Sequence, residues 1–198
     1  MRRHEIERIG LAWMSGVIDD EASLAGMTDV YDAAIEASLQ WAIRHRINDM
    51  QLEQAPAAIA IIGMGRYGGR EVNFSSDADV IIIYRPAEGA DDTQANLFAR
   101  KVQEDLRAIL QGPTTFEPKI ELDMDLRPEG KNGPLVRSYA SCEEYYRSWA
   151  STWEHQALLR ARYAAGDAAL AEDFLMNIAD PLRYPKIDLT ETQIAGNP

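Results

Sequence analysis

Residues 57–84, AAIAIIGMGRYGGREVNFSSDADVIIIY, decide the fold of this chain. Two apolar runs, residues 57–62 and 80–84, have the length and composition of buried strands. Between them lie a turn with four glycines in seven residues and then the acidic pair Asp77 and Asp79. The stretch therefore predicts a strand, a glycine-rich turn and a second strand that opens with two carboxylates.

The pair Asp77 and Asp79 is the first candidate for chemistry. In an extended chain, residues two apart point to the same side, with their Cα atoms roughly 6.6 Å apart. Carboxylates so placed repel each other unless a positive charge lies between them. A pair of divalent ions about 3.5–4 Å apart meets that need, and oxygen ligands favour Mg²⁺ or Mn²⁺. For the pair taken alone, an acidic turn that caps a helix is the alternative.

A third strand is predicted over residues 119–126, KIELDMDL, because apolar and polar residues alternate strictly there. Its apolar residues share one side, and Asp123 and Asp125 share the other. If this strand is the neighbour of residues 80–84, about 4.8 Å away, Asp123 comes alongside the first acidic pair. A solvent-exposed acidic face is the alternative. The candidate phosphate clamps that follow are Arg127, Lys131 and Arg137.

The glycine-rich turn, Gly63 to Gly69, contains a literal match to the dinucleotide-binding fingerprint. That motif requires a full helix after the glycines, and residues 69–74 allow one or two turns at most. The P-loop pattern also fails, because Gly69-Arg70 stands where Lys and Ser or Thr are needed. A plain structural turn is one interpretation. We favour the other, in which a ligand phosphate closely approaches the backbone.

Helical periodicity precedes this core. Residues 2–17 form one predicted helix, and a second is expected to begin after Thr28 as its N-cap. Together they make a helical lead-in over residues 1–50. We expect the main domain over residues 51–180, followed by a tail over residues 181–198.

Further helices are predicted after the second strand. Thr93 is expected to cap a helix that runs to about Leu110 and stops at Gly112-Pro113. Ser141 and Glu144 have the spacing of a capping box at the start of another helix.

The last predicted helix runs from about Trp153 to Ala165, with Gly166 at its C′ position. Arg160 and Arg162 lie on this predicted helix. Ion pairs with acidic neighbours and contacts with phosphate are both open interpretations for these two arginines. A stripe of aromatic residues is expected to pack in the core, and it consists of Tyr145, Tyr146, Trp149 and Trp153.

Composition limits the class of protein. The chain has 198 residues, 46% hydrophobic and 26% charged, which suits one good core with a helical appendage. No apolar run approaches the roughly 20 residues of a membrane span, and the N-terminal residues lack the apolar stretch of a signal peptide. A single cysteine, Cys142, excludes an internal disulfide framework. We expect a cytoplasmic protein with no membrane contact.

The net charge is -12, with 20 basic residues against 32 acidic ones. Proteins that grip a nucleic-acid backbone cluster Lys and Arg against the phosphates, and no basic run occurs here. The charge disfavours a nucleic-acid partner. The charge is compatible with binding of a single nucleotide whose phosphates are neutralised by metal ions.

These elements together supply what phosphoryl chemistry needs from a protein, namely positioning and neutralisation of the triphosphate charge. A glycine-rich loop, a serine, two aspartates and a third aspartate on an adjacent strand resemble the nucleotidyltransferase superfamily typified by DNA polymerase beta. The resemblance implies an α+β fold with a small mixed sheet and flanking helices.

Three longer motifs make the resemblance more specific. They are residues 63–80, GMGRYGGREVNFSSDADV, residues 126–136, LRPEGKNGPLV, and residues 153–162, WEHQALLRAR. All three are similar to signature stretches of the glutamine synthetase adenylyltransferases, and they come in the right order over nearly the whole chain.

The resemblance implies roles for particular residues. Carried over by position, the family's metal carboxylates fall on Asp77, Asp79 and Asp123, which would bind Mg²⁺ or Mn²⁺. ATP is the implied substrate, and Arg127 stays a candidate phosphate clamp. The phosphate-gripping positions are Gly63, Gly65, Gly68, Gly69, Ser75 and Ser76.

In that family one long chain holds two such catalytic units. The N-terminal unit removes AMP from glutamine synthetase by phosphorolysis, and the C-terminal unit adds AMP to a tyrosine of the same protein. Residues 126–136 and 153–162 resemble the adding unit of actinobacterial members, whereas residues 73–76, NFSS, resemble the removing unit of others. We predict transfer of AMP from ATP to glutamine synthetase, with release of pyrophosphate and regulation of nitrogen assimilation.

Two alternatives stay open. One is phosphorolytic removal of AMP from the same tyrosine, and the other is a regulatory nucleotide-binding module without catalysis. The presence of all three aspartates argues against the second. The resemblance also implies that residues 51–180 are the catalytic domain and that the tail over 181–198 is truncated before a helical bundle. In the family, glutamine and the PII signal protein control the balance of the two reactions, and the PII protein would act through the full-length chain, although no residue here identifies either contact.

Overall fold

Strands β1 (Ala57–Gly63) and β2 (Ala78–Pro86) form the antiparallel pair on which the rest of the structure is built. This computed structural model describes residues 2–112 and 118–184. Strand β5 (Arg162–Gly166) pairs antiparallel with the other edge of β1. Two short strands, β3 (Leu122–Asp123) and β4 (Val136–Ser138), pair parallel with β2. The sheet is thus small and mixed.

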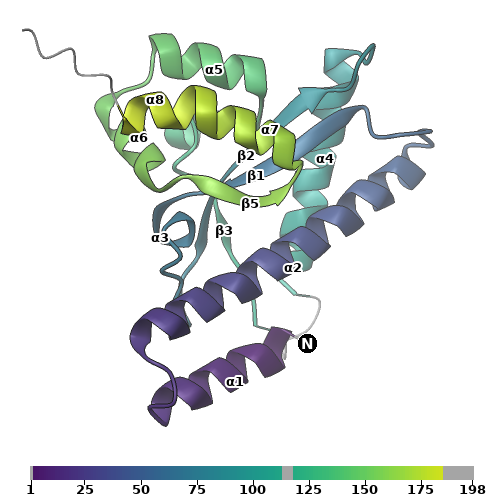
Figure 1. Cartoon of the computed structure of the whole chain (residues 1–198). Helices are drawn as coiled ribbons and strands as arrows, with labels where there is room; N and C mark the ends of the chain where they lie inside the picture. The colour runs from purple at the N-terminus through teal and green to yellow at the C-terminus, as the bar shows by residue number, and fades with distance from the viewer. Residues whose placement is uncertain (1, 113–117, 185–198) are drawn as a thin grey trace, which may run out of the picture.

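Both faces of the central strands are covered by helices (Figure 1). Alternate side chains of β1 and β2 pack on α2 (Asp20–Asp49) and α4 (Asp92–Leu110), or on α5 (Tyr139–Ser148) and α7 (Ala168–Phe174). Because both faces are buried, the strands read as continuous apolar runs. The predicted α+β fold with a small mixed sheet and flanking helices is confirmed.

The N-terminal helices share the main core. Helix α1 (Arg2–Met14) packs on α2, and α2 packs on α4 and β5. Thr28 was expected to cap α2, and this prediction is wrong because the Asp19 side chain accepts from the Ala22 amide and starts the helix earlier. Thr28 lies inside α2, where its hydroxyl donates to the Leu24 carbonyl at 2.8 Å. The domain division at residues 50 and 180 stays a prediction.

Helix α4 ends as predicted but begins at a different cap. The Asp91 side chain accepts from the Gln94 amide at 3.0 Å, so Thr93 lies in the first turn and is not the N-cap. Gly112 follows the helix with a φ of +77° and donates to the Ile109 carbonyl, which is how a glycine ends a helix. Pro113, the other half of the predicted stop, lies outside the described residues.

The third predicted strand exists but is short. Only Leu122 and Asp123 pair with β2, although the predicted alternation of buried and exposed side chains extends beyond them. The Asp123 carboxylate accepts from the Asp125 amide at 2.7 Å. Such a side-chain turn competes with strand pairing. The chain then continues into a 3₁₀ turn, η1 (Gly130–Asn132).

Two helix predictions in the second half are wrong. Ser138, not Ser141, caps α5, because its hydroxyl accepts from the Ser141 amide. The observed capping box lies at Ser151 and Glu154, at the start of α6 (Thr152–Ala157). The predicted helix over 153–165 therefore ends early.

The chain then turns through η2 (Leu158–Arg160) into β5. Gly166 ends this strand with a φ of +89°, and a Cβ there would overlap the Ile59 carbonyl. Pairing with β1 thus overrides the helical periodicity of this stretch. Helix α7 continues into a π-helical turn, η3 (Leu175–Ala179), and then α8 (Asp180–Arg183).

The predicted aromatic core stripe is only partly buried. Tyr146 is buried, but Trp149 is 76% exposed and Trp153 is 46% exposed, so the prediction fails for both tryptophans. No helix within residues 2–112 and 118–184 is both long enough and apolar enough to span a membrane.

Candidate metal centre

Three aspartates meet where β2 begins and β3 runs beside it. Asp77 immediately precedes β2, and the parallel register places Asp79 opposite Asp123. Each of the three offers one carboxylate oxygen, and these atoms all lie within 4.8 Å of one another. The predicted strand neighbourhood is therefore confirmed, and it forms a cluster of three carboxylates.

Like charges dominate the electrostatics of the cluster. Burial, followed by the negative charges of Asp77 and Asp123, raises the pKa of Asp79 to about 6. The positive charge of Arg66 and a hydrogen bond from its backbone amide oppose this rise. Arg66 lies in the short helix α3 (Gly65–Gly68), and its guanidinium is 3.7 Å from Asp77. The cluster therefore has less positive charge nearby than three ionised carboxylates need.

This donor set fits a divalent cation. All three ligands are carboxylate oxygens and all three aspartates are half-buried, which suits Mg²⁺ or Mn²⁺. A cation would also relieve the mutual repulsion that raises the Asp79 pKa. The residues that could hold the metal are Asp77, Asp79 and Asp123.

The repulsion at Asp79 leads to a prediction about stability. The folded-state pKa of about 6 lies above the unfolded value of about 4. Ionised Asp79 therefore destabilises the metal-free fold increasingly as the pH rises from about 4 to about 6, and the effect is constant above that. Without metal, Asp79→Asn should raise the melting temperature at about pH 7, and the gain should vanish by about pH 4.

Thermal unfolding in a chelator across this pH range tests the prediction. Asp125→Asn is the matched control, because the neighbours of that carboxylate are Lys131 at 3.1 Å and Arg127 at 3.6 Å. The control should not gain stability. A gain at Asp79→Asn that is equal at both ends of the pH range would contradict the electrostatic explanation.

The glycine-rich turn touches the cluster. Gly65 has a φ of +50°, and a Cβ built on it would overlap the Asp79 carboxylate. A Cβ on Gly68 would overlap backbone oxygens of Arg160 and Gly63. Close packing within the protein thus accounts for Gly65 and Gly68. A phosphate contact at this turn remains a prediction.

The two serines of the predicted phosphate site shape the approach to Asp77. The buried Ser76 hydroxyl accepts from the Asn73 amide at 3.1 Å, and the Tyr31 hydroxyl donates to the Ser76 carbonyl at 2.9 Å. The exposed Ser75 hydroxyl donates to the Asn73 side chain at 3.2 Å. Ser75 and Ser76 therefore hold the turn that delivers Asp77, and their contact with phosphate stays a prediction.

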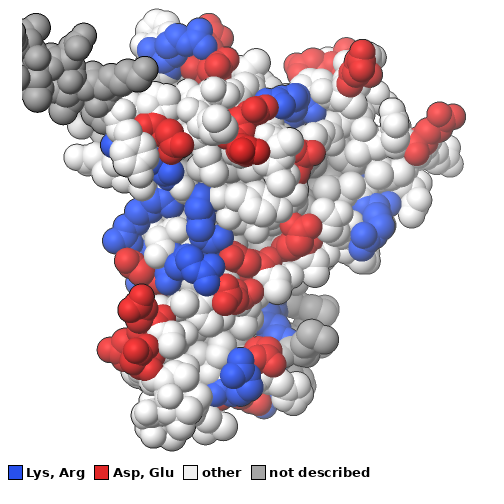
Figure 2. All heavy atoms as spheres, viewed as in Figure 1, with Lys and Arg blue, Asp and Glu red and all other residues white. Residues whose placement is uncertain are grey.

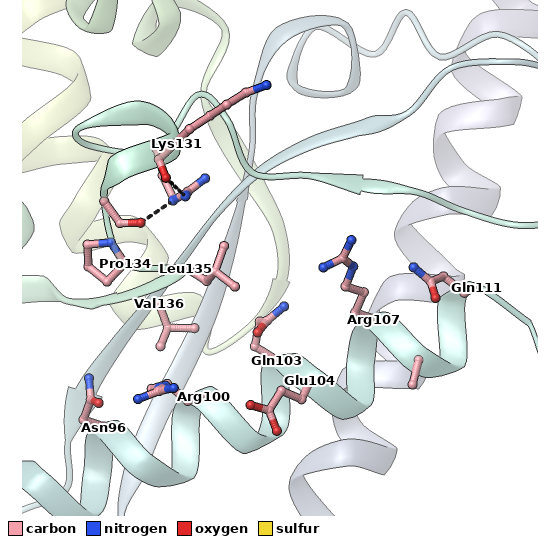
Figure 3. Close-up of a pocket in the computed structure, with 13 residues that line it drawn as sticks. Asn96, Arg100, Gln103, Glu104, Arg107, Gln111, Lys131, Pro134, Leu135 and Val136 are labelled. Carbon is pink, nitrogen blue, oxygen red and sulfur yellow. Dashed lines mark hydrogen bonds between the residues drawn. The ribbon is translucent and has the colours of Figure 1, made fainter.

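Arg127 is buried and uses its guanidinium inside the protein. It donates to the backbone carbonyls of Met124, Lys131 and Gly133 at 2.7, 3.1 and 2.9 Å. The bonds to Lys131 and Gly133 are the dashed lines in Figure 3. These contacts favour a role in holding the loop after β3 over direct clamping of a phosphate.

Arg160 and Arg162 are paired with acids. Figure 2 shows basic side chains gathered over the α3 region with acidic side chains around them. Arg160 pairs with Glu71, and Arg162 pairs with Asp32 at 2.8 Å. Of the two interpretations left open for Arg160 and Arg162, ion pairing is the one the structure shows.

Sequence reasoning missed two cations beside the carboxylates. Arg66 was embedded in the glycine-rich turn and not singled out. Arg107 of α4 lines a cavity of about 330 Å³ together with Asp77 and Asp123. No local motif marks Arg107, since only the packing of α4 against the sheet brings it there.

Comparisons with known proteins find one family and several relatives over most of the chain. The family described as glutamate-ammonia ligase adenylyltransferase matches residues 1–177. A bifunctional glutamine synthetase adenylyltransferase/adenylyl-removing enzyme of Bifidobacterium longum (strain DJO10A) is 78% identical over 98% of the chain. An enzyme of the same name from Mycobacterium tuberculosis (strain CDC 1551 / Oshkosh) is 46% identical over 93% of it. The chain spans 18% of the length of each of these relatives.

Proposed function

Since the chain belongs to the glutamate-ammonia ligase adenylyltransferase family, we propose that it transfers AMP from ATP to a tyrosine of glutamine synthetase and releases pyrophosphate. The single observation that carries this proposal is the meeting of Asp77, Asp79 and Asp123 beside a glycine-rich turn. The fold, with a small mixed sheet flanked by helices, suits a nucleotidyltransferase.

In the proposed reaction, Asp77, Asp79 and Asp123 would hold Mg²⁺ or Mn²⁺. Divalent ions bound there would neutralise charge on the triphosphate and favour ionisation of the acceptor hydroxyl. The three carboxylates are fixed by the pairing of β2 with β3 and by the turn at Asn73, so the site is organised before substrate arrives. ATP as substrate and the identity of the cation belong to this proposal.

The bond changes follow from nucleotidyl transfer. The tyrosine oxygen forms a bond to the α-phosphorus as the bond from that phosphorus to the bridging oxygen breaks, and pyrophosphate leaves. The phenolic proton passes to solvent or to a carboxylate of the cluster. Attacking and leaving oxygens lie roughly in line in such displacements, so the two substrates must reach the cluster from opposite sides.

The α3 side of the cluster suits the leaving pyrophosphate. Gly65 brings the backbone close to Asp79, and the Arg66 side chain is 53% exposed beside Asp77. An exposed guanidinium next to metal-binding carboxylates is placed to contact phosphate oxygens. This assignment places the phosphates at the same turn, residues 63–69, as the sequence-based prediction does. The PII signal protein and a cytoplasmic location stay predictions.

Removal of AMP from glutamine synthetase by phosphorolysis is the second candidate. It rests on residues 73–76, NFSS, which resemble the removing unit of related enzymes. Both reactions need the same carboxylates, because one is the transfer of AMP to tyrosine and the other is its transfer from tyrosine to phosphate. The cluster therefore supports either direction, and residues 126–136 and 153–162 are the reason we favour addition.

Product analysis separates the two directions. With ATP, Mg²⁺ and unmodified glutamine synthetase, the chain should produce pyrophosphate in an amount equal to the AMP attached. With AMP-modified glutamine synthetase, phosphate and no ATP, it should release little ADP. ADP release in the second assay without pyrophosphate in the first would assign removal to this chain and leave the metal centre intact.

A further inference from the structure

A second, larger cavity opens beside the carboxylate cluster (Figure 3). It has a volume of about 850 Å³ and lies between α4 and the loop that leads into β4. We call it the α4 groove. Its walls are Asn96, Arg100, Gln103, Arg107 and Gln111 along α4, and residues 133–136 opposite. Because Arg107 lines both this groove and the cavity at Asp77 and Asp123, the two spaces adjoin.

The groove adjoins the cluster at Asp77 and Asp123, whereas α3 contacts the cluster at Asp79 and, through Arg66, at Asp77. Asp79 faces α3, where the Arg66 amide and Gly65 contact it. The cavity that adjoins the groove is lined instead by Asp77 and Asp123. In-line displacement places the nucleophile and the leaving group on opposite sides of the phosphorus. With pyrophosphate at α3, the oxygen of the acceptor tyrosine comes from the groove side, whichever way the reaction runs.

The groove is lined mainly by positively charged residues, although the chain as a whole is negatively charged. The net charge is -12, yet the described lining residues carry four cations and one acid, Glu104. Arg100 and Arg107 are exposed, and the guanidinium group of neither forms an ion pair or hydrogen bond with another residue of 2–112 or 118–184. Figure 3 shows the Arg107 side chain rising from α4 toward the groove. Unpaired cations in a concave site favour an acidic ligand.

The shape of the groove suits an extended peptide. Residues 96 to 111 of α4 span about 22 Å, the length of roughly six or seven residues in extended conformation. Asn96 is half-buried and Gln111 is exposed on this wall, and their amide groups can pair with backbone groups of a bound segment. Leu135 on the opposite wall is 40% exposed and adds apolar contact.

From these observations we propose that the α4 groove binds an extended, acidic segment of glutamine synthetase and leads its tyrosine to the carboxylate cluster. This inference rests on the proposed function. It assigns Arg100 to recognition of the protein substrate, away from the reacting atoms, and it applies to addition and removal of AMP alike.

Charge reversal at Arg100 tests the proposal. Arg100→Glu should raise KM for glutamine synthetase by at least about tenfold, while KM for ATP and kcat stay within about twofold of the unaltered chain. Arg100→Lys should recover most of the loss. Arg44→Glu is the matched control, because Arg44 is exposed on α2 and lines neither of these cavities. Its guanidinium group likewise has no ion pair or hydrogen bond with another described residue. Arg44→Glu should leave every constant unchanged.

Binding of glutamine synthetase without nucleotide gives a readout that does not depend on turnover. The unaltered chain should bind it more weakly as salt rises from about 0.05 to about 0.3 M, and Arg100→Glu should abolish that salt dependence.

Three results would overturn the proposal. Equal KM for glutamine synthetase in Arg100→Glu and Arg44→Glu would do so. A raised KM for ATP in Arg100→Glu would mean that the groove binds the nucleotide and not the protein substrate. If the unaltered chain neither binds glutamine synthetase nor moves AMP in either direction, the proposed function has failed as well. If the chain binds glutamine synthetase and transfers AMP, but Arg100→Glu changes neither, only the assignment of the groove is wrong.

Discussion

Asp79→Asn should lower AMP transfer by at least about 10³-fold, the scale of losing a charge-stabilising element of an active site. The reason is that Asp79 lies opposite Asp123 in the parallel register and its carboxylate completes the cluster with Asp77. Replacing it with an amide removes one negative ligand and keeps the shape. The fold should be retained, with stability level or raised, because a repelled carboxylate is removed.

Neighbouring carboxylates provide the controls for this prediction. Asp77→Asn and Asp123→Asn should behave like Asp79→Asn, and Asp125→Asn should matter less because its carboxylate pairs with Lys131. Titration with Mn²⁺ by calorimetry should show the same ranking without any turnover. Near-normal activity in Asp79→Asn would contradict the metal centre. A larger loss in Asp125→Asn than in Asp123→Asn would mean that the third ligand is misassigned.

Gly65→Val should be the most damaging change after the loss of an aspartate of the cluster. Its Cβ would occupy the space of the Asp79 carboxylate, which would have to move. Displacing a catalytic group by about 1 Å can cost about 10²-fold in rate. The same side chain would fill the space at α3 where we place the triphosphate, so ATP affinity measured by calorimetry should also fall.

The positive φ of Gly65 is a separate source of damage that needs its own control. Gly89 has a φ of +75° and no atom within 4 Å of a built Cβ, so Gly89→Val imposes the backbone strain without the overlap. It should lower the melting temperature slightly and leave transfer unchanged. If both variants lose the same activity, strain explains the loss. If Gly65→Val keeps its ATP affinity and rate, the turn is structural only.

The parts of the fold that sequence predicted are those with local causes. The apolar runs of β1 and β2 are buried on both faces, so their length and composition were sufficient. The alternation of apolar and polar residues around Asp123 identified the face of the third carboxylate. The turn in which the Asp123 side chain accepts from the Asp125 amide nevertheless shortened the strand. With those three elements, the cluster of aspartates could be predicted.

The failures have tertiary causes. Residues 162–166 have helical periodicity, but the free edge of β1 pairs with them. Three helix starts were misplaced because several Ser, Thr and Asp residues competed for each cap, and packing decided between them. Arg107 meets Asp77 only through the docking of α4, which no sequence pattern encodes.

Transfer of label from ATP to glutamine synthetase tests the central claim most directly. The chain is incubated with Mg²⁺, unmodified glutamine synthetase and ATP labelled at either the α- or the γ-phosphate, and the acceptor is analysed by mass and by label. The account predicts that the α-label is attached as AMP to a tyrosine, that the γ-label leaves in pyrophosphate, and that Asp79→Asn attaches neither. Attachment of the γ-label, or an undiminished α-label in Asp79→Asn, would contradict it.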